Sequence, residues 1–448
     1  MDFDAIVIGT GNAGQTAAGA LVDAGWRVAI VEEDDVGGTC ALRGCVPKKV
    51  LVAAAETLEA IARAADHRID VGEAKLDWAG LIDRERSFVE GVPDEVARSL
   101  AKRGLEVVRG HARFTGRNEV DVGGRRLRAP KIVVATGSKP RPLPFEGADR
   151  LMTSDVLLRT RTLPSRAVFV GAGVIAFELA HVLVRAGSDV TMLEATPRPL
   201  GPFDEEAVDR LVAATRDAGI DIRTGVRVRR VEARDDRWSV VYEADGEELE
   251  LVVDSAIHGA GRVAALDGLE LESAGVKVDA GKPVLDAHLR SESNPHVLFA
   301  GDARGPGPQL SPVASYEGRL VAHNLLDEGS PRSPDYDCIP SCVFAIPALA
   351  MVGRTEKQAR DDGVQVDVRE SDMQSWISAR TYAEREAYAK ILVERETDRI
   401  VGAHLVGHGC TETIHAFALA MRHGLPASAL AEMVYAYPTF HSDIRHLL

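Results

Sequence analysis

Two cysteines at a fixed spacing are the residues of this sequence best suited to chemistry. Cys40 and Cys45 stand in the stretch Gly-Gly-Thr-Cys-Ala-Leu-Arg-Gly-Cys-Val-Pro-Lys-Lys, which runs from Gly37 to Lys49. Cys45 opens a helical pattern, and a helix N-terminus together with Lys48 favours a thiolate there. Two buried structural cysteines would need neither the glycines nor the proline and lysine. A zinc site would need further regularly spaced ligands, and none lies nearby. We therefore predict a redox-active cysteine pair.

A glycine-rich turn near the N-terminus predicts a first dinucleotide site. An apolar run leads into Gly9-x-Gly11-x-x-Gly14, and a helical pattern follows. Such glycines permit a tight turn and a close approach of the backbone to a pyrophosphate, which lies at the helix N-terminus. Glu32 ends the next apolar run, where it can accept a hydrogen bond from a ribose 2′-hydroxyl.

A second turn of the same design predicts a second dinucleotide site. Gly171-x-Gly173-x-x-Ala176 follows an apolar run and opens a helical pattern, with alanine as a known variant at the third place. Glu194 ends the next run at the same spacing as in the first copy. A carboxylate there favours NADH, because it repels the 2′-phosphate of NADPH. Arg198, four residues later, could partly serve that phosphate.

The elements that position these motifs follow from the apolar pattern. Two β-α-β units carry the glycine turns, and amphipathic helices are predicted at 50–65 and 93–103. Further strands are predicted at Glu106–Arg109, Lys131–Ala135, Ser239–Tyr242, Leu251–Ile257 and Val297–Ala300. From Pro331 onward we predict an α+β segment. Its strands are Ser341–Phe344, Val364–Ser371, Ala387–Val393 and Ile400–Val406, and its helices are Thr355–Asp361 and Thr411–His423.

Composition excludes several classes of protein. The 448 residues include 53 Lys+Arg and 68 Asp+Glu, and the net charge of −15 argues against nucleic acid as the main partner. Five cysteines in so long a chain are not a disulfide scaffold. The N-terminal residues show no signal peptide, and the most apolar stretch, Cys342–Val352, is shorter than the ~20 residues of a membrane helix. We predict a soluble cytoplasmic protein without a membrane or nucleic-acid partner.

The cysteine stretch between two dinucleotide folds resembles the two-cysteine flavoprotein disulfide reductases, the class I pyridine nucleotide-disulfide oxidoreductases. These include glutathione reductase, dihydrolipoamide dehydrogenase and mercuric reductase. Four further stretches resemble family motifs: Ala135-Thr-Gly137, Ala300-Gly-Asp302-Ala303, Pro312-Val-Ala-x-x-Glu-Gly-Arg319 and Ile339-Pro-Ser-Cys-Val-Phe-Ala-Ile-Pro347. The resemblance implies an α/β fold with two Rossmann-like dinucleotide-binding domains, for FAD and for NAD(P), and a C-terminal α+β dimerisation domain.

The resemblance also implies boundaries and binding positions. The FAD-binding domain would span 1–145 and 263–330, the NAD(P)-binding domain 146–262 and the dimerisation domain 331–448. The positions implied for FAD are Gly9, Gly11, Asn12, Ala13, Gly14, Glu32, Glu33, Gly38, Thr39, Lys48, Ala112, Thr136, Gly137, Asp302, Pro312, Val313 and Ala314. Those implied for NADH or NADPH are Gly171, Gly173, Val174, Ile175, Glu194 and Gly261.

The family's electron path implies catalytic roles. Electrons pass from nicotinamide to FAD and then to the disulfide. By position, Cys45 would be the charge-transfer thiol beside the flavin, and Cys40 the interchange thiol that attacks substrate. Lys48 would lie near the flavin and pair with Glu178. Val174 stands where glutathione reductases usually carry a tyrosine and dihydrolipoamide dehydrogenases an aliphatic residue. A packed core valine is equally compatible with it.

The C-terminus departs from the family's pattern. There the catalytic base is a histidine in His-Pro-Thr, followed five residues later by a glutamate and supplied by the partner subunit. Tyr437 and Ser442 take these two places. Mercuric reductases also carry tyrosine there, but their C-terminal cysteine pair is missing here. His441, beside Asp443, could be a displaced acid/base or a polar interface histidine. Tyr437 could donate a proton, although its ordinary pKa of ~10 makes it a poor base at neutral pH.

Other unusual residues carry weaker predictions. Arg43, next to an atypical Leu42 in the cysteine loop, either faces substrate or is solvated. Cys338, Cys342 and Cys410 are predicted to be packing residues.

Three functions fit these observations. The first is a homodimeric, FAD-dependent NAD(P)H reductase of a low-molecular-weight disulfide, working through Cys40 and Cys45. The second is reduction of a soft metal ion such as mercury, or of a quinone, because such acceptors leave no thiolate to protonate. The third is the dihydrolipoamide dehydrogenase component of a multienzyme complex. Val174 and Glu194 favour this third function, and the missing histidine–glutamate dyad opposes it.

Overall fold

The computed structural model describes residues 2–448, and within that range no helix is long and apolar enough to cross a bilayer. The chain divides into two compact units. The first comprises the segment up to Lys48, Asp83–Arg141 and Arg262–Asp335. The second comprises Lys49–Ile82, Pro142–Gly261 and Tyr336–Leu448. Each unit has its own central sheets and its own apolar core.

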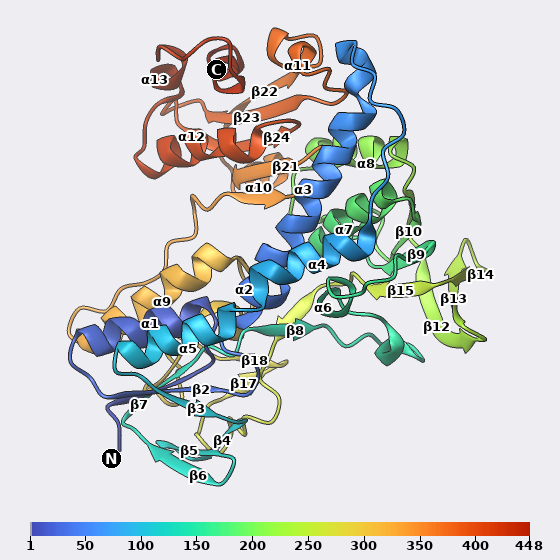
Figure 1. Ribbon diagram of the computed structural model, residues 1–448. Helices are drawn as coiled ribbons and strands as arrows, with labels where there is room; N and C mark the ends of the chain where they lie inside the picture. Colours follow the sequence, from blue (N-terminus) through green and yellow to red (C-terminus); the bar gives the residue numbers. More distant parts are fainter. Residues whose placement is uncertain (1) are drawn as a thin grey trace. The chain divides into compact units, whose positions relative to one another are not determined.

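A five-stranded parallel sheet forms the centre of the first unit (Figure 1). Its order is β19 (Val297–Phe299), β7 (Lys131–Val134), β1 (Ala5–Ile8), β2 (Val28–Glu32) and β3 (Glu106–Arg109). All four residues of β1 are buried, because alternate side chains pack into cores on the two faces of the sheet. This explains why β1 reads as a continuous apolar run rather than an alternating one.

Helices cover one face of this sheet and a small antiparallel sheet covers the other. Helices α1 (Asn12–Asp23), α5 (Val92–Lys102) and α9 (Ser311–Leu326) contribute to the core on the first face. Strands β4 (Ala112–Gly116), β5 (Glu119–Val122) and β6 (Arg125–Arg128) contribute to the core on the second. Figure 1 shows the three helices together and the β5–β6 hairpin on the opposite side of the sheet. The result is a layered α/β domain.

The second unit contains a four-stranded parallel sheet. Its order is β11 (Asp221–Thr224), β10 (Asp189–Glu194), β9 (Arg166–Val170) and β15 (Ser255–His258). Helices α7 (Val174–Ala186) and α8 (Glu205–Asp217) share a core with Phe169 of β9. The neighbouring Val168 and Val170 pack instead with an antiparallel sheet of β12 (Arg227–Arg234), β13 (Arg237–Ala244) and β14 (Glu247–Val253).

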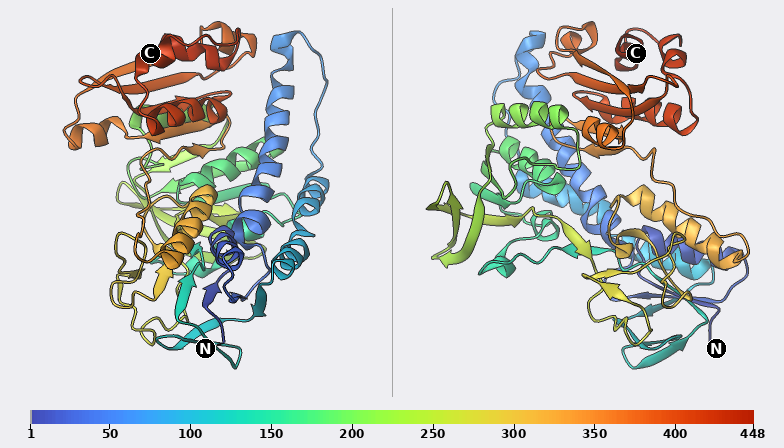
Figure 2. Two further views of the ribbon diagram at one scale, coloured as in Figure 1. Left: turned by 90° about the vertical axis from the view of Figure 1, so that its left-hand side faces the viewer. Right: turned by 180° about the vertical axis from the view of Figure 1, so that it is seen from behind.

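A five-stranded antiparallel sheet forms the C-terminal part of the second unit. Its order is β20 (Ser341–Val343), β21 (Leu349–Gly353), β24 (Ile400–Val406), β23 (Tyr388–Glu394) and β22 (Val366–Asp372). Its core on one face includes α12 (Cys410–Arg422), α13 (Ala427–Ala431) and α14 (Ile444–Leu447). Helix α8 contacts β21, β23 and β24, and Figure 2 shows this green helix beside the orange and red strands.

The remaining elements lie outside these sheets and the helices already described. The helices are α2 (Gly38–Arg43), α3 (Cys45–Ala62), α4 (Trp78–Val89), α6 (Ser154–Leu157), α10 (Glu356–Asp361) and α11 (Ile377–Thr381). The 3-10 turns are η1 (Ala64–His67), η2 (Ala148–Arg150), η3 (Gly301–Arg304) and η4 (Phe440–Asp443). Two small ladders pair β8 (Ser138–Pro140) with β16 (Arg262–Ala264), and β17 (Val278–Asp279) with β18 (Lys282–Pro283).

The predicted fold class is confirmed, with one strand divided differently. The strand predicted at Ile400–Val406 has those bounds, and the helix predicted from residue 50 begins earlier, at Cys45. The single strand predicted at Leu251–Ile257 is wrong. β14 ends at Val253 and β15 starts at Ser255, because the Asp254 carboxylate accepts a hydrogen bond from the backbone N–H of Arg166 at 2.9 Å. The predicted domain boundaries stay predictions.

A fully buried lysine connects α8 with the C-terminal sheet. Lys390 on β23 has no exposed surface, and its Nζ lies 3.3 Å from Asp204, 2.6 Å from Glu206 and 2.5 Å from Glu356. The hydrogen bond from Lys390 lowers the pKa of Glu206 to about 2. Because the folded-state pKa is depressed, this carboxylate stabilises the fold above its ordinary value of 4.5, and the contribution is lost as the pH falls towards 2.

Replacing this lysine should therefore destabilise the protein strongly. Lys390→Met leaves buried Asp204 without its cation, and we expect the free energy of unfolding to fall by about 3–5 kcal/mol, measured from the denaturant midpoint. Lys357→Met is the matched control, because Lys357 pairs with Asp361 on an exposed surface. The denaturant midpoint of this variant should stay close to that of the wild type, because an exposed ion pair contributes little to stability. Equal midpoints for the two variants would contradict a structural role of the buried cluster.

Candidate active site

The positions assigned to FAD gather at the carboxyl edge of the first unit's parallel sheet. They follow the ends of β1, β2, β3, β7 and β19 or lie in the first turns of α1, α2, α3 and α9. Those at or after the ends of strands are Gly9, Gly11, Glu32, Glu33, Ala112, Thr136, Gly137 and Asp302. Those in first helical turns are Asn12, Ala13, Gly14, Gly38, Thr39, Lys48, Pro312, Val313 and Ala314. Ligands of open α/β sheets bind at this edge.

The first glycine turn is too tight for side chains. A Cβ at Gly9, whose φ is 109°, would lie 2.3 Å from the carbonyl oxygen of Ala135, and one at Gly14 would lie 1.9 Å from that of Gly9. The Glu32 carboxylate accepts hydrogen bonds from the backbone N–H groups of Thr10, at 2.9 Å, and Asp34, at 3.0 Å. Its remaining lone pairs can still accept from a ribose hydroxyl. The turn at the start of α1 therefore fits the pyrophosphate of FAD.

A second polar group lies at the end of β19. The Ser138 hydroxyl donates to the Asp302 carboxylate at 2.7 Å and accepts from Arg262 Nε at 2.9 Å. The backbone N–H of Gly301 donates to buried Glu317 on α9 at 2.7 Å. These contacts fix Asp302 at the predicted second FAD motif. Ser138 and Arg262 were not predicted as site residues, because neither belongs to a motif.

Three helix N-termini converge on the cysteine pair. Asn12, Cys45 and Ser311 are the first residues of α1, α3 and α9, and the side-chain amide of Asn12 donates to the hydroxyl of Ser311. All three of these residues lower the pKa of the Cys40 thiol, which lies on α2. Helix N-termini stabilise anions, so this position favours a thiolate. The sequence did not single out Ser311, which is remote from the cysteines along the chain.

The two free cysteines share a proton unequally. The hydrogen bond with Cys45 lowers the pKa of the Cys40 thiol to about 6, and the same contact, together with burial, raises the pKa of the Cys45 thiol. The charge of Lys48 lowers the pKa of Cys45 but is outweighed. The prediction that Lys48 and the helix favour a thiolate at Cys45 stays a prediction. The directions of the two shifts favour Cys40 as the thiolate of the dithiol.

Two charged residues near this loop, Arg43 and Glu33, each contact a polar side chain. Arg43, for which substrate contact and solvation were left open, forms an ion pair with Asp34. The carboxylate of Glu33 lies 2.6 Å from Nδ1 of His111. Both contacts attach the loops that follow β2 to neighbouring elements.

The second glycine turn opens α7. A Cβ at Gly171, whose φ is 98°, would lie 2.6 Å from the backbone of Ala260, next to Gly261. Gly173 is the residue before the helix, and Val174 and Ile175 form its first turn. The Glu194 carboxylate accepts from the backbone N–H groups of Ala172 and Thr196, at 2.8 Å each. Arg198 forms an ion pair with Glu205 at 3.2 Å. Its charge is thus already partly neutralised.

Glu178, the residue implied to pair with Lys48, is buried on α7. Its carboxylate accepts a hydrogen bond from the backbone N–H of Phe344 at 3.1 Å. Lys48 belongs to the first unit and Glu178 to the second, so their pairing stays a prediction.

The C-terminal candidates differ in accessibility. Tyr437 is 67% exposed, and Ser442 forms a capping box with Thr439 at the start of η4. Nδ1 of His441 lies 3.5 Å from the hydroxyl of Thr413. The carboxylate of Asp443, which sequence proximity placed beside His441, accepts a hydrogen bond from Ser378, and burial raises its pKa.

The remaining cysteines lie in the C-terminal part of the second unit. Cys410 is buried in the core on one face of the sheet, against which Cys342 packs, and its thiol donates to the carbonyl of Ala348 at 3.4 Å. Burial raises the pKa of the Cys410 thiol. These contacts agree with the packing role that was predicted for both residues.

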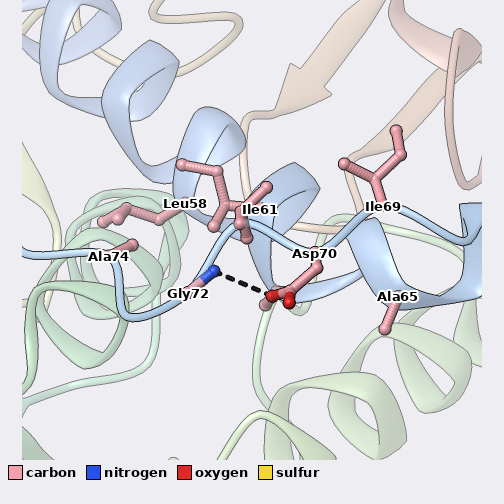
Figure 3. A pocket seen from close by; sticks show the side chains of 9 residues that line it. Leu58, Ile61, Ala65, Ile69, Asp70, Gly72 and Ala74 are labelled. Atoms are coloured by element: carbon pink, nitrogen blue, oxygen red, sulfur yellow. Dashed lines mark hydrogen bonds between the residues drawn. The ribbon is translucent and has the colours of Figure 1, made fainter.

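The cavity shown in Figure 3 lies away from the predicted site residues. It has a volume of about 390 Å³ and is formed by the end of α3 and the chain that follows it. Leu58, Ile61 and Ile69 contribute apolar walls, and the backbone N–H of Gly72 donates to the Asp70 carboxylate at 3.2 Å. No predicted catalytic or cofactor-binding residue lines it.

Comparison with known protein families defines the class. A family described as pyridine nucleotide-disulphide oxidoreductase matches residues 3–318, and the dimerisation domain of the same family matches residues 339–448. The chain belongs to the pyridine nucleotide-disulfide oxidoreductase family, as the cysteine stretch predicted. It is a flavin-dependent enzyme of a family that binds FAD and a pyridine nucleotide.

Individual relatives are spread over several activities. The chain is 33% identical over 451 residues to a dihydrolipoyl dehydrogenase of Chlorobaculum tepidum, covering 99% of this chain and 96% of that protein. It is 30% identical over 448 residues to a mercuric reductase of Bacillus cereus, covering 99% and 70%. A solved Cu(II) complex of the HOCl-induced flavoprotein disulfide reductase RclA from Escherichia coli has a TM-score of 0.89 at 29% identity, covering 100% and 99%.

The shared proton of the cysteine pair leads to a prediction. In the reduced enzyme, alkylation by iodoacetamide should occur first at Cys40 and rise with pH through about 6, because the thiolate is the nucleophile. Cys45→Ala removes the hydrogen bond that lowers this pKa most, so the alkylation midpoint should move to higher pH. Peptide mapping by mass spectrometry identifies the modified sulfur. First modification at Cys45, or an unchanged midpoint in Cys45→Ala, would contradict this assignment.

Proposed function

We propose that the protein reduces a low-molecular-weight disulfide through Cys40 and Cys45, with electrons from NADH. The observation that carries the proposal is the lowered pKa of Cys40 where three helix N-termini converge. A thiolate at neutral pH is the form that attacks a disulfide sulfur. The family relationship supplies the class of reaction.

The proposed steps assign different work to the two sulfurs. FAD, when bound, supplies the transfer of electrons from the nicotinamide to the Cys40–Cys45 disulfide. The glycine turn at Gly9, Glu32 and Asp302 would hold it. The Cys40 thiolate attacks the substrate disulfide and forms a mixed disulfide. Cys45 then attacks Cys40 and releases the second substrate thiol. Lys48, which the family's pattern pairs with Glu178, would lie near the flavin.

We also propose that the enzyme is a homodimer. The family's dimerisation domain matches the C-terminal sheet, and in the family's pattern the partner subunit supplies the acid/base. Tyr437 and His441 are the candidates that the sequence offered for that role. The cytoplasmic location stays a prediction.

NADH is the proposed electron donor because of the groups that end β10. The Glu194 carboxylate accepts hydrogen bonds from two backbone N–H groups. A negative charge at the end of this strand would repel the 2′-phosphate of NADPH, which supports the proposal. Arg198, the cation nearest in sequence, is paired with Glu205.

A second candidate acceptor is a metal ion. The chain is similar to a mercuric reductase and to a protein solved as a Cu(II) complex, and Tyr437 replaces the family's histidine. Reduction of a metal ion leaves no thiolate to protonate, so this replacement would be harmless. The third candidate, a dihydrolipoamide dehydrogenase component, is supported by the 33% identity to that enzyme.

Removing the attacking sulfur should separate the two half-reactions. In Cys40→Ala, NADH should still reduce the flavin in an anaerobic stopped-flow experiment, while steady-state turnover of disulfides should fall to background, since no thiolate attacks. The acceptor panel should include glutathione-type, cysteinyl, lipoyl and thiol-histidine disulfides, Cu(II), Hg(II) and a quinone.

Cys410→Ala is the control for loss of a thiol. Disulfide turnover that persists in Cys40→Ala would refute the proposal. Metal reduction without disulfide turnover in the wild type would favour the second candidate.

The coenzyme preference gives a separate prediction. We expect kcat/KM for flavin reduction to be higher with NADH than with NADPH. Glu194→Ser should narrow the difference, because it removes the carboxylate that repels the phosphate. Glu205→Ser removes the ion-pair partner of Arg198 instead. It should also narrow the difference in kcat/KM between NADH and NADPH, but less than Glu194→Ser does. A wild-type preference for NADPH would show that Arg198 outweighs Glu194.

A further inference from the structure

We infer that His408, oriented by Glu384, is the acid that protonates the leaving thiolate in the cysteine pair of a second copy of this chain. The inference rests on the proposed disulfide reduction and names a residue that the sequence did not suggest. His408 lies between β24 and α12, outside the segment where the family's pattern places its histidine.

A buried carboxylate faces one nitrogen of this imidazole. Nδ1 of His408 lies 3.4 Å from Oε1 of Glu384, whose side chain is 8% exposed. Glu384 is fixed in turn by Arg63 of α3, whose guanidinium lies 3.0 Å from its other oxygen. A carboxylate at Nδ1 orients the ring and leaves Nε2 as the nitrogen that can exchange a proton with a ligand.

The other side of the ring is accessible. The His408 side chain is 50% exposed, and within residues 2–448 no hydrogen-bond partner engages Nε2. A substrate could therefore approach Nε2 while Glu384 stays protected from water. This combination of a protected carboxylate and an open nitrogen is what an acid/base histidine requires.

Two aromatic rings hold the imidazole beside the C-terminal segment. Tyr382 stacks on it at 5.2 Å between ring centroids, with an angle of 13°, and Phe440 lies at 5.0 Å. Phe440 belongs to the stretch Tyr437–Asp443, which aligns with the family's histidine–glutamate segment. The geometry therefore places an intact histidine–glutamate pair next to the segment in which the usual pair is replaced.

The candidates inside that segment fit the role less well. Asp443 accepts its hydrogen bond from Ser378, so it is not the carboxylate that orients His441. Tyr437 is exposed, and no carboxylate contacts its hydroxyl within residues 2–448. His408 has both an orienting carboxylate, that of Glu384, and an accessible Nε2.

The proposed step balances protons and electrons. The Cys40 thiolate forms a bond to one sulfur of the substrate, the S–S bond of the substrate breaks, and the electron pair goes to the leaving sulfur. The imidazolium of His408 gives its Nε2 proton to that thiolate and becomes neutral. The thiol of Cys45 then gives its proton to the neutral imidazole, and the resulting Cys45 thiolate attacks the Cys40 sulfur of the mixed disulfide. The re-formed imidazolium protonates the second thiolate as the Cys40–Cys45 disulfide closes. One proton from water restores the imidazolium before the next turnover.

The test is the variant His408→Gln. The matched control is His415→Gln, because His415 is an exposed residue of α12. In His408→Gln, kcat/KM for the disulfide should fall about 100- to 10,000-fold, while flavin reduction by NADH stays at the wild-type rate. The pH profile of kcat/KM, which reports the acid and base of the free enzyme, should change shape in His408→Gln. Glu384→Gln, which changes a positioning residue, should lower kcat/KM less than His408→Gln does. His415→Gln should leave both half-reactions unchanged.

Mixed dimers test whether the acid comes from the second copy. A heterodimer of Cys40→Ala and His408→Gln chains has one site with an intact cysteine pair and an intact His408 from the other chain. It should regain about half of the wild-type disulfide turnover, although each parent homodimer is inactive. An inactive heterodimer would overturn the inter-subunit role.

The single variants distinguish failure of the inference from failure of the proposed function. If His408→Gln keeps the disulfide turnover and the pH profile of the wild type while Cys40→Ala is inactive, the inference is overturned and the proposed function stands. Residual disulfide turnover in Cys40→Ala would instead refute the proposed function itself.

Discussion

The active site depends on the close approach of two glycine backbones. A Cβ at Gly38 would lie 2.4 Å from Cα of Gly11. Helix α2 can therefore lie against the start of α1 only because residue 38 is a glycine. This contact brings Cys40 to the edge of the parallel sheet where α1, α3 and α9 begin. The partial positive charges of these helices then act at one place on two kinds of anion, a cofactor pyrophosphate and a cysteine thiolate.

Charged side chains organise the second unit in a different way. Arg185 of α7 pairs with Glu59 of α3 at 2.8 Å, Glu59 lies 3.4 Å from Arg63, and Arg63 lies 3.0 Å from Glu384. This chain of ion pairs joins the nucleotide-binding part, the helix that carries Cys45, and the C-terminal part. Lys390 adds a second connection through its buried carboxylates. Because these groups are poorly solvated, removing any one would leave a charge without compensation.

Tyr437 and Ser442 stand where the family's pattern has a histidine and a glutamate, so the source of the proton is the main chemical question for this protein. Its relatives act on lipoyl groups and mercury, and the protein solved with Cu(II) is described as a disulfide reductase. A disulfide substrate needs a proton donor for its leaving thiolate, whereas a metal ion does not. The chemistry of this branch therefore depends on whether another residue, for which His408 has the best surroundings, supplies that proton.

The sequence by itself determined the family, the fold class, the cysteine pair and the glycine turns. These features depend on short-range patterns, since a tight turn or a buried parallel strand restricts neighbouring residues directly. Only the tertiary structure placed Ser311 beside Cys40, where it lowers the pKa of that thiol, because Ser311 starts a helix that is remote from the cysteines along the chain. It alone joined His408 with Glu384 and Arg63, which no motif connects along the chain.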